Sequence, residues 1–111
     1  MATEDDVRRI ALELSKVTER LCYGTPAFYV AGKIFARFHD QPGVLVLWCA
    51  SVEERQELLD SAPEVFFTTD HYRGHASVLV RLEQIGAEEL AELLDEAWRF
   101  RGPRRLTDPK S

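Results

Sequence analysis

The chain has 111 residues, of which 45% are hydrophobic and 30% are charged, and its formal net charge is −5. This length and composition predict one globular domain, residues 1–111, with a single core. No apolar run approaches the roughly 20 residues needed to cross a bilayer, and the acidic start lacks a signal-peptide core. We therefore expect a cytoplasmic protein without a membrane partner. The net acidity argues against a protein that coats nucleic acid.

The charges are unevenly distributed along the chain. Residues 51–70 and 86–98 hold 11 of the 19 acidic residues and one of the 14 basic residues. The remaining segments hold 8 acidic and 13 basic residues, a local balance of +5. A basic surface can therefore form away from the two acidic segments.

Amphipathic helices are expected near both ends of the chain. Residues 3–15 carry one apolar stripe at helical spacing, and Thr3 can cap its first turn. A second helix is expected to begin at Gly86, and Gly102 with Pro103 ends it. The tail, residues 103–111, is expected to fray.

The segments between these helices favour β-strands. Residues 27–30 and 33–38 flank Ala31-Gly32, a two-residue break ending in glycine that is typical of a β-hairpin. Residues 44–49 are apolar without alternation, which indicates a central strand buried on both faces.

Four further elements complete the expected order. Short strands are predicted at 21–23, after Glu64, and at 77–82, and a capping box at residues 51–54 opens a short helix that runs to about Asp60. Hairpin connections imply an antiparallel sheet. We therefore predict a two-layer α+β fold, with the N- and C-terminal helices packed on one sheet face and a short inserted helix.

The chain lacks a recognisable catalytic or metal signature. No nucleophile elbow or isolated carboxylate pair is present, so we expect no enzyme and no cofactor. Cys22 and Cys49 lie in apolar strand-like segments, and we interpret them as buried free thiols. His71 and His75 have no evident third ligand, so we expect no metal site.

Four segments together carry a family resemblance: Tyr23–Pro26 with Phe28, Gly32–Ala36, His71–Gly74 and Val78–Leu82. In this order and spacing the chain resembles the MmcQ/YjbR-like proteins over about residues 5–105. The resemblance implies an α+β layer related to frataxin (CyaY) and a DNA-binding "double wing" domain. After Gly74 this chain has His75-Ala76-Ser77, where the family commonly has an aromatic residue and a proline.

The implied partner is double-stranded DNA, and the expected contacts are to phosphates. Lys33 and Arg37 are expected to lie on one strand face with Phe35 between them, while Ile34, Ala36 and Phe38 face the core. The full set of predicted contacts is Lys33, Arg37, His71, Tyr72, Arg73, Arg104 and Arg105.

Each of these segments also has a structural interpretation. Residues 71–75 can be a turn that contains glycine and an aromatic residue for shape, and Lys33 and Arg37 can be the solvent face of a strand. The arginines at 99–105 can complement the negative end of the last helix.

The alternative function is a non-enzymatic protein-interaction or small-ligand-binding domain without a nucleic-acid role. The acidic helices favour it, and a frataxin-like surface that binds a divalent metal at Glu4, Asp5 and Asp6 belongs to this class. We expect a monomer under either interpretation.

Overall fold

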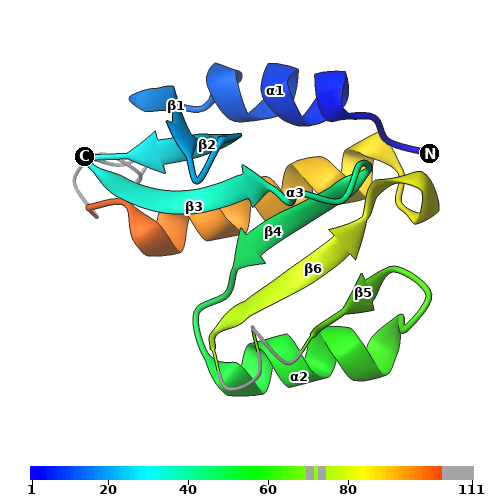
Figure 1. The fold of residues 1–111 in the computed structure, drawn as a ribbon. Coiled ribbons are helices and arrows are strands. Elements are labelled where there is room, and N and C mark those ends of the chain that lie inside the picture. The colour runs from blue at the N-terminus through cyan, green and yellow to red at the C-terminus, as the bar shows by residue number, and fades with distance from the viewer. Residues whose placement is uncertain (70–71, 73–74, 104–111) are drawn as a thin grey trace.

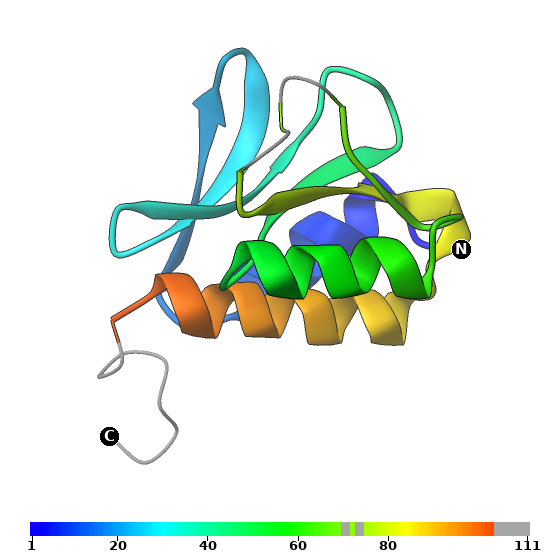
Figure 2. The same ribbon diagram turned by 90° about the horizontal axis from the view of Figure 1, so that it is seen from below.

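The computed structural model describes residues 1–69, 72 and 75–103. A six-stranded antiparallel sheet has the strand order β1-β2-β3-β4-β6-β5. Helices α1, α3 and α2 lie in that order across one side of the sheet (Figures 1 and 2). The strands are β1 (Val17–Cys22), β2 (Thr25–Val30), β3 (Lys33–Phe38), β4 (Val44–Trp48), β5 (Phe66–Phe67) and β6 (Ser77–Arg81). The predicted two-layer α+β fold is confirmed.

Helices α1 and α2 each begin after a residue whose side chain caps the first turn. In α1 (Glu4–Glu13), Thr3 Oγ1 accepts from Asp6 N–H, and Asp6 accepts from Thr3 N–H, which completes a capping box. This backbone hydrogen bond from Thr3 lowers the pKa of the Asp6 carboxyl. Ser51 caps α2 (Val52–Ser61) by accepting from Glu54 N–H at 3.1 Å. A 3-10 turn at Leu82–Gln84 then leads to α3 (Ala87–Arg101).

Two hairpins of the same type form β1, β2 and β3. Their turns are Tyr23-Gly24 and Ala31-Gly32, and all four residues have positive φ, between 52° and 84°. Such turns follow the right-handed twist of the flanking strands. The second hairpin was predicted. For the first hairpin only a short strand at 21–23 was predicted, whereas β1 begins at Val17 and Tyr23 belongs to the turn. The four central residues of β1, 18–21, are exposed, and all except Leu21 are polar or charged, so they carry no apolar alternation.

The main core fills the space between the helices and the sheet. Val7 from α1, Phe28 and Val80 from the strands, and Leu90 and Leu94 from α3 are fully buried in it. A smaller cluster of Val44, Val46 and Leu79 lies on the opposite sheet side, with Trp48, Phe67 and Tyr72 packed against it. Strand β4 contributes to both clusters, which confirms that it is a central strand buried on both faces.

The predicted alternation along β3 is wrong at Phe35. In the register between β2 and β3, Phe28 is opposite Ala36 and Tyr29 is opposite Ile34, so Phe35 is the extra residue of a β-bulge. Phe35 is therefore fully buried in the main core together with Ala36 and Phe38. Ile34 is displaced to the opposite side, where it is half-buried.

The two cysteines differ, although both thiols are free. Cys49 is buried as predicted, whereas Cys22 is half-buried, because it is the last residue of an edge strand. Burial, with a smaller contribution from Glu54, raises the pKa of the Cys49 thiol to about 12. Cys49 therefore stays protonated at neutral pH.

Candidate nucleic-acid interface

Three arginines lie on the sheet side that faces away from the helices, which we call the helix-free face. Cross-strand partners share a side, and Arg37 is opposite Val46, while Val46 is opposite Leu79. Both Val46 and Leu79 belong to the smaller cluster on this side. By the same register Arg20 on β1 and Arg81 on β6 lie on this side as well.

The strand residues assigned to the helix-free face include no acidic side chain, and all of them belong to the described part of the chain. They are Thr18, Arg20, Cys22, Thr25, Ala27, Tyr29, Ile34, Arg37, Val44, Val46, Trp48, Phe67, Ser77, Leu79 and Arg81. The face therefore combines a positive charge with an aromatic and aliphatic surface.

Each of the three arginines contacts an aromatic residue. The Arg20 guanidinium lies 4.2 Å from the centroid of the Tyr29 ring, and that of Arg81 lies 4.1 Å from the Phe67 ring. Both distances are within the range of cation–π contacts. A guanidinium stacked on a ring keeps N–H groups in its own plane that can donate to an acceptor. In Arg81, Nη1 donates to the Pro63 and Glu64 carbonyls at 3.3 and 3.4 Å.

The third contact joins two of the residues predicted from the sequence. Arg37 Nη2 donates a 2.6 Å hydrogen bond to the Tyr72 hydroxyl, across 35 residues of sequence. Its Nη1 donates to Thr25 Oγ1 at 3.1 Å and to the Phe38 carbonyl at 3.3 Å. Tyr72 also lies beside His39, with ring centroids 6.1 Å apart. The Arg37 guanidinium is thus fixed on the helix-free face.

Of the other residues predicted to contact DNA, only Lys33 belongs to the described part of the chain, and it does not lie beside Arg37 and Tyr72. Lys33 is opposite Val30, whose side chain lies in the main core, so Lys33 lies on the helix side of the sheet edge. The bulge at Phe35 is the reason that Lys33 and Arg37 do not share a face. His71, Arg73, Arg104 and Arg105 lie outside the described residues.

Two arginines of the face, Arg20 and Arg81, were missed from the sequence. Arg81 lies in a strand whose alternation of Val78, Val80 and Leu82 was recognised, so its position opposite the core could have been inferred from period two. Arg20 lies in the polar edge strand, which gave no such signal.

The helix layer has the opposite charge character. Glu53, Glu57, Glu88, Glu89, Glu92 and Glu96 are exposed on α2 and α3. A groove of about 810 Å³ lies between these helices, with an apolar floor that includes Leu58 and Ala97. Glu54, Glu57 and Glu96 line its walls. Helix α3 also carries the Arg99–Asp95 ion pair, with 2.7 Å between Arg99 Nε and Asp95 Oδ2.

Metal binding has little support at the acidic N-terminus. Glu4 Oε2 accepts from Gly43 N–H at 3.2 Å, and Asp6 is used by the cap and by Arg9. Within residues 1–69, 72 and 75–103, no group of three His, Cys, Asp or Glu side chains is placed to hold a metal ion. None of the described helices is long and apolar enough to span a membrane.

The fold and this face define a small α+β protein with one sheet side covered by helices and the other lined by arginine and aromatic side chains. The chain belongs to the YjbR family, whose model matches residues 12–100.

The chain is also similar to one solved structure and to curated proteins from mycobacteria. The crystal structure of Deinococcus radiodurans protein DR2400, with family-model domain DUF419, matches with a TM-score of 0.73 and 28% identity. The match covers 88% of this chain and 77% of that chain. The chain is also 45% identical over 49 residues to the uncharacterized proteins Rv2570 of Mycobacterium tuberculosis and Mb2600 of Mycobacterium bovis. These matches cover 44% of this chain and 38% of each relative, so they span less than half of the relatives' length.

Proposed function

We propose that this protein binds double-stranded DNA through phosphate contacts on the helix-free face. The observation that carries the proposal is the row of Arg20, Arg37 and Arg81, each held by an aromatic partner on a sheet side without acidic strand residues. Arginine binds phosphate oxygens well because its planar guanidinium presents paired N–H donors.

The charge distribution supports one orientation on DNA. Helices α2 and α3, which carry the exposed glutamates, lie on the other side of the sheet (Figure 2). Because DNA phosphates repel these glutamates, the protein is expected to bind with the arginines of the helix-free face toward the DNA. A net charge of −5 is therefore compatible with DNA binding in this orientation.

The proposed role is non-enzymatic, needs no cofactor and reads no sequence directly. Contacts to phosphates position a protein on a duplex without distinguishing base pairs. Arg73, Arg104 and Arg105 remain predicted contributors to the same electrostatic attraction, while Lys33 is a weaker candidate because of its side of the sheet.

The test compares two charge reversals by fluorescence anisotropy with a 20-base-pair duplex. Arg20→Glu removes an exposed arginine of the helix-free face, whereas Arg9→Glu removes an exposed arginine of α1 and serves as the control. One charge-assisted hydrogen bond contributes about 1.5–3 kcal/mol, so Arg20→Glu should raise the dissociation constant about tenfold or more. Arg9→Glu should change it less than about twofold, since rim charges far from the contact contribute little.

The salt dependence gives a second readout. Loss of one phosphate contact should reduce the slope of log K against log salt by about 0.9. Equal effects of the two reversals, or no binding by the unsubstituted protein at low salt, would overturn the proposal.

The groove between α2 and α3 favours a second candidate function, the docking of another protein. Its apolar floor and glutamate walls suit a basic amphipathic helix, whose apolar side would face Leu58 and Leu93. A synthetic Leu/Lys amphipathic peptide is the probe. The double variant Glu57→Lys/Glu96→Lys should abolish its binding, while Glu53→Lys/Glu92→Lys, which reverses two exposed charges of the same helices outside the groove lining, should not.

A further inference from the structure

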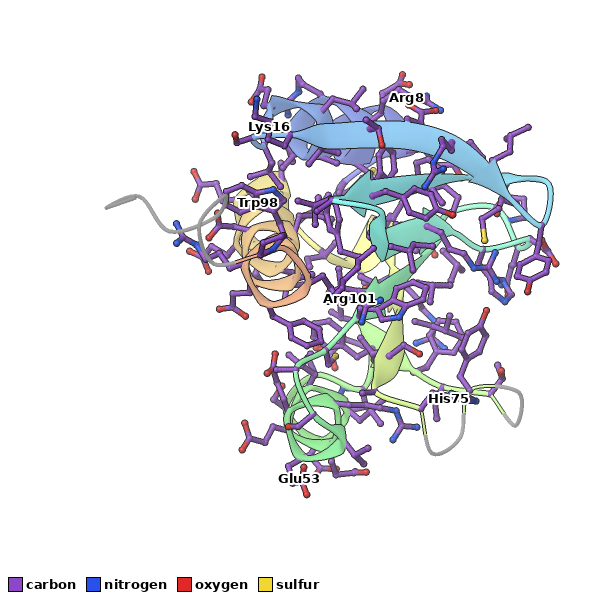
Figure 3. All side chains as sticks on the ribbon, turned by 90° about the vertical axis from the view of Figure 1, so that its left-hand side faces the viewer. Arg8, Lys16, Glu53, His75, Trp98 and Arg101 are labelled. Carbon is purple, nitrogen blue, oxygen red and sulfur yellow. The ribbon has the colours of Figure 1, made fainter. Side chains whose placement is uncertain are left out.

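A second cavity opens at the end of the sheet where β4 ends and β6 begins. Its volume is about 300 Å³, and its lining includes Trp48, Tyr72, His75, Phe100 and Arg101. These residues come from β4, from the segment before β6, and from the end of α3. Figure 3 shows Arg101 reaching from α3 toward the strands, with His75 on the loop at the same end of the sheet.

Three aromatic side chains are brought together here from distant parts of the sequence. Trp48 and Tyr72 both pack against the Val46 and Leu79 cluster of the helix-free face. The hydrogen bond from Arg37 holds the Tyr72 hydroxyl at 2.6 Å. Phe100 is 41% exposed, although it is a large apolar residue. The cavity thus offers flat apolar surface that is continuous with the arginine row.

The cavity is positively charged, in contrast to the neighbouring groove. Arg101 Nε donates a 2.7 Å hydrogen bond to the Ile34 carbonyl, which fixes its guanidinium beside the cavity. None of the lining residues, all of them described by the structure, is acidic. The adjoining groove shares Trp48, Cys49, Ala50 and Phe100 with this lining. Its own lining has three glutamates and one arginine, Arg99.

We propose that this cavity receives one unpaired nucleobase of a bound nucleic acid, with the adjacent phosphate on Arg101. The inference rests on the proposed function and deepens it, because it adds a preference for DNA that contains an unpaired base. Aromatic side chains stack on any base, and each such stack is worth about 1–3 kcal/mol. The cavity volume lies at the low end of ligand pockets, roughly 300–1,000 Å³, which suits a single base better than a larger ligand.

The first experiment titrates deoxyadenosine monophosphate (dAMP) and follows the indole N–H signals by NMR. Trp98 serves as an internal control, because its Nε1 donates to the Ser15 carbonyl at 2.9 Å, its side chain is buried, and it does not line the cavity. A saturable shift of Trp48 in the millimolar range, with Trp98 unmoved, is the expected result. No shift of Trp48 would overturn the nucleobase site, whether or not duplex DNA binds.

The second experiment compares a perfect 20-base-pair duplex with the same duplex carrying one unpaired adenine. The protein should bind the bulged duplex about tenfold more tightly, since one added stack contributes about 1–3 kcal/mol. Phe100→Ala and Arg101→Gln should each reduce this ratio toward one. Leu12→Ala is the matched control, because Leu12 is 43% exposed on α1 and lies outside the cavity.

The outcomes separate this proposal from the proposed function. Equal affinity for the two duplexes, or a ratio unchanged in both cavity variants, overturns the nucleobase site and leaves phosphate binding standing. Failure to bind either duplex removes the proposed function, and the dAMP titration then decides about the cavity alone.

Discussion

The two sides of the sheet are built from alternate residues of the same strands, and they differ in almost every property. Phe38 packs in the main core under the helices, while its neighbour Arg37 lies on the helix-free face and bonds Tyr72. On the covered side the helices present glutamates to solvent, and on the other side arginines pair with aromatic rings. The main core therefore lies on one side of the sheet, and the DNA contacts that we propose lie on the other.

Buried apolar residues are not confined to the helix side, because some also lie at the centre of the helix-free face. Val46 and Leu79 are fully buried on the helix-free face, under Trp48, Phe67 and Tyr72. Arg20, Arg37 and Arg81 therefore lie around an apolar centre, and its Trp48 and Tyr72 also line the smaller cavity.

The largest expected effect tests the covered side through two neighbouring residues of β2. Phe28 is fully buried against Phe38, with ring centroids 5.8 Å apart, whereas Tyr29 is half-buried beside Arg20. Phe28→Ala should lower the free energy of unfolding by about 3–5 kcal/mol, because it leaves a cavity in the core. Tyr29→Ala should cost less than half as much in urea denaturation. Equal losses would contradict the division between the two faces.

The next effect tests the helix-free face. Arg37→Gln removes the positive charge, and the shorter side chain no longer reaches Thr25 and Tyr72. Duplex affinity should fall about tenfold, the equivalent of one charge-assisted hydrogen bond. Arg99→Gln on the helix layer should leave anisotropy titrations unchanged, and a similar loss in that control would mean that net charge alone governs binding.

A smaller effect is expected from Tyr72→Phe, which removes the hydroxyl that accepts the 2.6 Å hydrogen bond from Arg37. The free energy of unfolding should fall by about 1 kcal/mol, the usual value of one hydrogen bond. Thermal and urea denaturation measure this change. A loss above about 3 kcal/mol would show that the contact organises the surrounding loop rather than the arginine alone.

The smallest effect at neutral pH concerns the thiols. Burial raises the pKa of Cys49 to about 12, above its unfolded value near 9, so the folded state disfavours the thiolate. This contribution to stability is fully present below about pH 9 and is lost as pH rises toward 12. In the native protein iodoacetamide should modify Cys22 and spare Cys49, which the variants Cys22→Ser and Cys49→Ser distinguish. Equal modification rates would contradict the burial of Cys49.

Much of the fold followed from local signals in the sequence. The capped ends of the helices, the Ala31-Gly32 turn and the alternation through Val78 and Val80 were each specified by residues close together in the chain. The bulge at Phe35 was not, because the register between β2 and β3 decides which residue is left unpaired.

The candidate site was less predictable than the fold. The sequence identified Arg37 and Tyr72 separately, but their hydrogen bond depends on packing between segments 35 residues apart. No local sequence pattern indicated that Arg20 belongs to the site. The sequence pattern around Phe100 and Arg101 predicts only the end of an amphipathic helix. Their shared cavity arises only when α3 lies against β3 and β4.

The most direct test of the central claim is an amide NMR titration with a 20-base-pair duplex at about 50 and 200 mM salt, the range over which phosphate-driven binding weakens most. At low salt we expect shifts at Arg20, Tyr29, Arg37, Tyr72 and Arg81, which are lost at high salt, and little change in α2. Shifts confined to α2 and α3, or no shifts at low salt, would contradict the assignment of DNA binding to the helix-free face.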